Sequence, residues 1–111
     1  MQKNNPEITY AKAMTQQPPA AVAAVDACIK AMDRAIKHAE GQGLTARETR
    51  ARGIMAFKLS IPIMDSTERV TSAIACIVAG MNAELIDGKQ GGALLYAAQV
   101  ALTVLRQGGA K

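Results

Sequence analysis

Apolar side chains recur every three or four residues along most of the chain, which is the spacing of one helix face. Residues 20–40 show this spacing most clearly. There we expect a helix that presents a face of large residues to a partner helix: Val22, Val25, Ile29, Met32 and Ile36. A second line of small residues runs beside it and would let another helix approach closely: Ala24, Cys28, Ala31 and Ala35. Gly41 and Gly43 should end this helix by a left-handed glycine turn.

The next helix is predicted from its cap. Thr45 and Glu48 have the spacing of a capping box, in which each side chain satisfies the other residue's backbone amide. The helix should end before Pro62, because a proline pushes the preceding residue toward extended backbone. Gly53 should weaken its middle by about 1 kcal/mol relative to alanine.

A further helix should open at Asp65 or Ser66, with Glu68 as the capping partner. Its large apolar face is predicted to comprise Val70, Ile74, Ile77, Val78, Met81 and Leu85. A small-residue flank beside that face comprises Ala73, Cys76 and Gly80. The two lines together indicate a helix that packs on more than one side.

The last helix should start at Asp87, whose side chain can cap it while Gln90 reaches back, and should run to about Arg106 before Gly108 and Gly109 close it. Its inward residues are predicted to be Leu94, Leu95, Ala98, Ala101, Leu102 and Leu105. Residues 70–83 and 90–105 carry no charged side chain, so both helices should be central or covered by another chain. Because only one helix of so small a domain can be central, we expect self-association.

These elements predict an all-α fold, a compact bundle of four main helices with a short N-terminal helical arm. Residues 1–19 should form the polar arm, in which Asn5 and Pro6 cap a short helix. Residues 20–107 should form the bundle and residues 108–111 a tail. Composition supports this fold class, since 22 of the 111 residues are alanine and only 3% are aromatic, which disfavours a β-sandwich or barrel.

Candidate chemistry is sparse, and an enzyme is not expected. His38 is the only histidine, so a histidine metal cluster is excluded, and its place near a helix end favours a dipole role over catalysis. Cys28 and Cys76 are isolated and lie among alanines, which favours core packing over a reactive thiol, a zinc site or a disulfide. We predict no cofactor and no bound metal. With no apolar leader and no membrane span expected, the predicted location is the cytoplasm.

The net charge of +4 is concentrated in residues 30–58, which hold seven bases and three acids. The residues that could contact the phosphates of a nucleic acid are Lys30, Arg34, Lys37, Arg47, Arg50 and Arg52. A solvated face that keeps an apolar protein soluble is the competing interpretation. The segment lacks stacking aromatics, so nucleic-acid binding is the second choice.

A polar stripe on the last helix is the best candidate for a protein-binding face. It lies opposite the predicted inward residues and comprises Tyr96, Gln99, Thr103 and Arg106. Tyrosine and arginine are among the side chains that most often carry interface energy. An ordinary exposed helix face is the equal alternative.

Residues 62–101 contain Pro62 and Asp65 before a helix, then Ile86-Asp87-x-Lys89, and the run from Leu94 to Ala101. This stretch is similar to a helical pair in small bacterial proteins of unassigned function, many of them associated with mobile elements. The resemblance implies a helical fold and no activity. We therefore interpret the chain as a non-enzymatic bacterial or phage accessory, adaptor or regulator that acts through protein contacts and self-association, with nucleic-acid association as the alternative.

Overall fold

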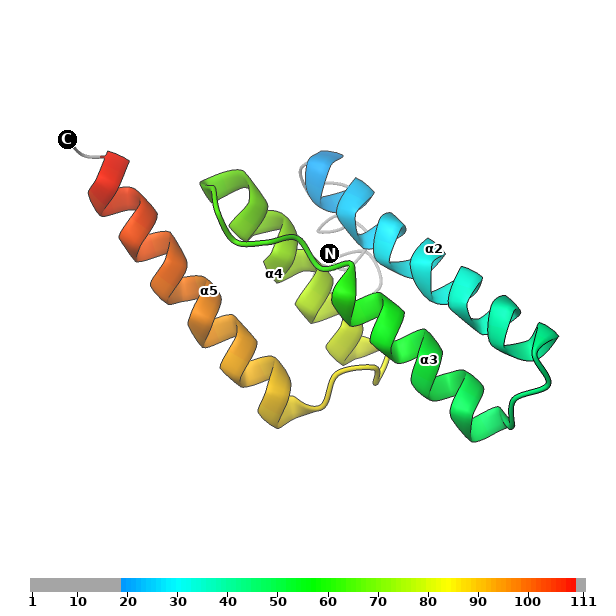
Figure 1. The fold of residues 1–111 in the computed structure, drawn as a ribbon. Helices are drawn as coiled ribbons and strands as arrows, with labels where there is room; N and C mark the ends of the chain where they lie inside the picture. The colour runs from blue at the N-terminus through cyan, green and yellow to red at the C-terminus, as the bar shows by residue number, and fades with distance from the viewer. Residues whose placement is uncertain (1–18, 110–111) are drawn as a thin grey trace, which may run out of the picture.

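Four helices make up residues 19–109, the part of the chain that the computed structural model describes (Figure 1). They are α2 (Pro19–Gly41), α3 (Ala46–Leu59), α4 (Thr67–Asn82) and α5 (Gly88–Gly109). The predicted all-α fold is confirmed, and each of the four main helices lies close to its predicted position. The short helix predicted near Asn5 falls outside the described residues.

The turn between α2 and α3 forms as predicted. Gly43 adopts a left-handed backbone with φ of 74°, which ends α2 and which a residue with a Cβ atom rarely adopts. The Glu48 amide donates to Thr45 Oγ1 at 3.1 Å, and the Thr45 amide donates to Glu48 Oε1 at 2.9 Å. The Thr45 amide and hydroxyl both donate to the Glu48 carboxylate, and these bonds, assisted by the nearby Arg52 guanidinium, hold the pKa of Glu48 below its ordinary value of 4.5.

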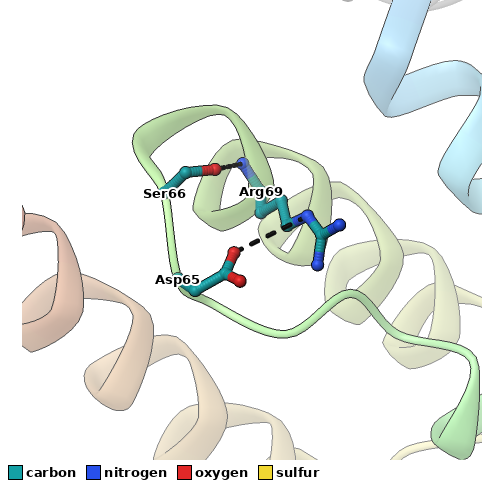
Figure 2. Close-up of polar contacts among 3 residues, drawn as sticks. All are labelled: Asp65, Ser66 and Arg69. Atoms are coloured by element: carbon teal, nitrogen blue, oxygen red, sulfur yellow. Dashed lines mark hydrogen bonds and ion pairs between the residues drawn. The ribbon is translucent and has the colours of Figure 1, made fainter.

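The cap of α4 corrects one prediction (Figure 2). Ser66 is the N-cap, and its Oγ accepts from the Arg69 amide at 3.1 Å. Arg69 also reaches back with Nε to Asp65 Oδ1 at 3.6 Å. The capping partner is therefore Arg69, and the prediction for Glu68 is wrong because the cap lies at Ser66, one residue beyond the position that would pair with Glu68.

The start of α5 agrees with the prediction, and its end lies a little beyond the expected position. Asp87 Oδ1 accepts from the Gln90 amide at 2.7 Å, which is an N-cap hydrogen bond. The helix then continues past the expected end near Arg106, through Gly108 to Gly109. Gly109, one of the two glycines predicted to close the helix, is its last residue within the described part of the chain.

Helix α4 lies at the centre of the arrangement. It packs against α2 on one side and against α5 on the other, while α3 packs mainly on α2 (Figure 1). Helix α5 stands at the edge of the molecule, with α4 between it and α2. The prediction that only one of the two uncharged helices is central therefore holds for α4.

The core forms where α2, α3 and α4 converge with the α4–α5 connection. Its fully covered members are Cys28, Phe57, Cys76 and Ile86. The Phe57 ring packs beside Gly80, where an added Cβ would lie 3.1 Å from Phe57 Cε1 and 2.6 Å from Ile86 Cδ1. Gly53 similarly allows the Ile36 side chain to approach α3 closely. These glycines shorten the distance between helices, so a residue that weakens an isolated helix strengthens the packing here.

The buried line of α2 differs from the predicted face. It consists of Cys28, a member of the predicted line of small residues, and of Ala21 and Ala39, which belong to neither predicted line. Val22 and Ile29, which we expected to meet a partner helix, are exposed. They lie about 80–100° around the helix from the buried line. On α4, Val78 is likewise exposed, while the flank of Ala73, Cys76 and Gly80 is buried.

Candidate functional site

The outer face of α5 places all four predicted interface residues in solvent. Tyr96, Gln99, Thr103 and Arg106 are all exposed, and Tyr96 exposes 70% of its surface. Because these positions are three or four residues apart, they share one side of the helix. The structure therefore brings the predicted residues together on one surface.

Two further apolar residues on this side of α5 were missed by the sequence reasoning. Val100 and Val104 are exposed, Val104 by 60%, and they follow Tyr96 at intervals of four residues. Their spacing from Tyr96 was a signal that could have found them. We call the six exposed residues the α5 outer face: Tyr96, Gln99, Val100, Thr103, Val104 and Arg106.

The α5 outer face is exposed because α5 packs mainly on a single helix. Its contact with α4 fully buries only Gly91 and Ala98. The other residues predicted to face inward are half-buried: Leu94, Leu95, Ala101, Leu102 and Leu105. The predicted direction is therefore correct, but the contact is shallow and covers about one side of the helix.

Chemically, the α5 outer face combines apolar area with a few polar groups. The Thr103 hydroxyl donates to the Gln99 carbonyl at 3.0 Å, so its proton is already used within the helix. Arg106 takes part in neither of the two ion pairs found among residues 19–109. A tyrosine, two valines and a cation on one rigid helix suit contact with a protein surface.

The six basic residues proposed for nucleic-acid contact are all exposed, but they do not form one patch. Lys30 Nζ binds Asp26 Oδ2 at 3.0 Å on α2. On α3, Arg50 and Arg52 lie about 160° apart around the helix, which places them on different sides. Arg52 also lies near the Glu48 carboxylate. The positive charge is therefore divided between surfaces.

The two cysteines, isolated in sequence, meet in the core. Cys28 of α2 and Cys76 of α4 are fully covered free thiols whose side chains share a hydrogen bond. Burial raises the pKa of Cys28. Burial and the neighbouring Cys28 side chain together raise the pKa of Cys76 to about 12. A thiol with a raised pKa carries little thiolate at neutral pH and is a poor nucleophile. This environment agrees with the prediction of core packing.

His38 is exposed near the C-terminal end of α2, as its sequence position predicted. Within residues 19–109, no three or more histidine, cysteine or acidic side chains are grouped closely enough to hold a metal ion. No helix in the same range combines the length and apolar character that crossing a membrane requires.

Comparison with family models, with curated proteins and with solved structures found no match to this chain. The resemblance of residues 62–101 to a helical pair of bacterial proteins therefore stays a prediction.

Proposed function

We propose that this chain is a non-enzymatic binding protein that self-associates through the α5 outer face. The observation that carries the proposal is the exposure of Tyr96, Val100 and Val104 in one line on a helix whose main contact is with α4 alone. An exposed apolar line of this kind, flanked by polar residues, marks a contact surface in soluble proteins. An accessory role in a bacterium or phage rests on the resemblance of residues 62–101.

The charge pattern favours a second copy as the partner. Arg106, at one end, is the one charged residue of the α5 outer face, because residues 90–105 carry no charge, so the face offers little for a strongly acidic or basic surface to match. A two-fold axis near Val100 would pair two α5 helices in antiparallel fashion and keep the two Arg106 side chains about 18 Å apart along the axis. A parallel pair would place these cations side by side. We therefore propose the antiparallel arrangement.

The test is the mass of the protein in solution as a function of its concentration, measured by sedimentation equilibrium. Tyr96→Ala should raise the dimer dissociation constant at least tenfold, because an interface tyrosine typically carries about 1–2 kcal/mol and a two-fold dimer contains two copies of it. Leu59→Ala is the matched control, since Leu59 on α3 exposes 78% of its surface and lies outside the α5 outer face. It should leave the dissociation constant unchanged.

A monomeric mass at all concentrations up to about 1 mM contradicts self-association. A dissociation constant of about 1 mM corresponds to a binding free energy of only roughly 4 kcal/mol. If a different protein is then shown to bind the chain directly and Tyr96→Ala weakens that complex, the α5 outer face is a binding surface for another protein. Equal effects of Tyr96→Ala and Leu59→Ala would place the interface elsewhere.

Nucleic-acid association is the second candidate, supported by the exposure of all six basic residues. If these residues contact four to six phosphates, the logarithm of the affinity for B-DNA should fall with the logarithm of salt concentration with a slope of about −4 to −5. A flat response, or no binding at low salt, removes this candidate. Because the charge is divided over two sides of α3, we rank nucleic-acid association behind self-association.

A further inference from the structure

A cavity of about 440 Å³ lies between α2, α3 and the α4–α5 connection, away from the α5 outer face. Its walls are apolar and are formed by Met32, Ile36, Leu44, Ile54 and Leu85. Each of these side chains is half-buried, because one side packs in the protein and the other borders the cavity. The volume is in the range of pockets that hold small molecules.

Thr49, one of the residues that line this cavity, carries a buried hydroxyl without a partner. Thr49 exposes only 7% of its surface, and its Oγ1 has no hydrogen-bond partner. Two other helical hydroxyls behave differently: Thr71 and Thr103 each donate to the carbonyl four residues earlier, at 3.0 Å. A buried hydroxyl that lacks a partner destabilises a protein, because it has lost its hydration without gaining a hydrogen bond. Such a cost at a cavity wall points to a ligand that supplies the missing hydrogen bond.

The charges at the cavity constrain the ligand. Glu40 and Arg50 both line it and both are exposed, so they lie where the cavity opens to solvent. Their opposite charges favour neither an anionic nor a cationic ligand. Among the residues that line the cavity, the most deeply buried polar group is the neutral Thr49 hydroxyl, and a charged group beside it would lose its hydration without a counter-charge.

We propose that this cavity binds a small neutral molecule with an apolar body and one carbonyl group, whose oxygen accepts a hydrogen bond from Thr49. The hydroxyl oxygen is covered by its neighbours, so binding requires rotation about the Thr49 Cα–Cβ bond to present it to the cavity. Threonine populates two rotamers in helices, which makes this rotation accessible. The apolar walls bind the body of the ligand, and the hydroxyl sets the position of its head group.

The test uses octan-2-one as the probe and follows the methyl signals of Met32, Ile36, Leu44, Ile54 and Leu85 by NMR during titration. We expect saturable shifts at these residues. Octanoate and octylammonium, which have the same chain length and carry a charge, should bind at least fivefold more weakly. Thr49→Val should weaken octan-2-one binding about fivefold, which is the value of one hydrogen bond of roughly 1 kcal/mol. The same variant should unfold at an equal or higher denaturant concentration, because the uncompensated hydroxyl is removed.

Two variants control for indirect effects. Thr71→Val removes a hydroxyl that donates to its own helix on α4, so octan-2-one affinity should be unchanged. Ala46→Met fills part of the cavity with a larger side chain from an exposed helix position, and it should abolish the titration without unfolding the protein. The proposal is overturned if no saturable shift occurs at the five wall residues, if octanoate binds as tightly as octan-2-one, or if Thr49→Val leaves the affinity unchanged. Tyr96→Ala should not alter octan-2-one binding, so this result is independent of self-association.

Discussion

Helices α4 and α5 are alike in sequence and differ in their surroundings. Both contain a long run without charge, residues 70–83 in one and residues 90–105 in the other. Helix α4 fully buries six residues between its two neighbours: Val70, Ser72, Ala73, Cys76, Ile77 and Gly80. Helix α5 fully buries only Gly91 and Ala98. A run without charge therefore identifies a helix that has apolar contacts, but the number of its neighbours decides how deeply it is buried.

The largest expected effect comes from truncating one aliphatic side chain in each helix and comparing the two losses of stability. Ile77→Ala in α4 should lower the free energy of unfolding by about 2–5 kcal/mol, because Ile77 is fully covered. Leu105→Ala in α5 should cost less than about 2 kcal/mol, because Leu105 is only half-buried. Chemical denaturation of both variants measures the difference. Equal losses would mean that α5 is covered as deeply as α4 in solution.

The second test adds a methyl group to a glycine in each helix. In Gly80→Ala the new Cβ would lie 2.6 Å from Ile86 Cδ1 and close to the Phe57 ring, and we expect a loss of about 1–3 kcal/mol. Gly92→Ala meets open space on α5 and should raise stability by about 0.5–1 kcal/mol. The midpoints of thermal unfolding should move in opposite directions. A shift of both in the same direction would contradict the packing difference.

The third test removes one helix cap in each part of the molecule. Thr45→Ala breaks the capping box of α3, and Asp87→Ala removes the cap of α5. Each should cost about 1 kcal/mol. Because α5 has one main neighbour, we expect Asp87→Ala to increase amide hydrogen exchange within α5 alone. Exchange that rises throughout α2, α3 and α4 would show that α5 unfolds together with them.

The smallest expected effect depends on pH and on the capping box of α3. The folded-state pKa of Glu48 is lowered by its hydrogen bonds to Thr45, so its contribution to stability is present above pH 4.5 and is lost as the pH falls through the folded value. Glu48→Gln keeps an acceptor for the Thr45 amide and should remove this part of the pH dependence. Urea unfolding at several pH values below 5 provides the measurement. An unchanged profile in Glu48→Gln would assign the acid sensitivity to other carboxylates.

The features that depend on neighbours in sequence were predictable. Thr45 with Glu48, Gly43 and Asp87 all have their predicted local roles, because caps and turns involve residues three or four apart. The cap at Ser66 remained an alternative, since Asp65 is an equally good cap residue and only the fold distinguishes them. Local chemistry therefore places the starts of the helices to within one or two residues.

The rotation of each helix was harder to predict. Val22 and Ile29 are large and apolar, and by hydropathy they belong in a core, yet the line that faces α4 contains Cys28 and alanines. Where two helices approach closely, small residues fit at the contact. Which side of a helix makes this contact depends on the shape of the partner helix. For the same reason, the sequence identified the polar side of α5 but did not reveal the cavity at Thr49, whose walls come from two helices and two connections.

The contact between Cys28 and Cys76 provides a built-in measure of how fast the core opens. Both thiols are fully covered, and burial keeps them protonated, so a thiol reagent reacts only after α2 and α4 separate. At high reagent concentration, the labelling rate then equals the rate of that separation. The native sequence thus carries its own probe of how often the core opens, with no dye or engineered label to disturb it.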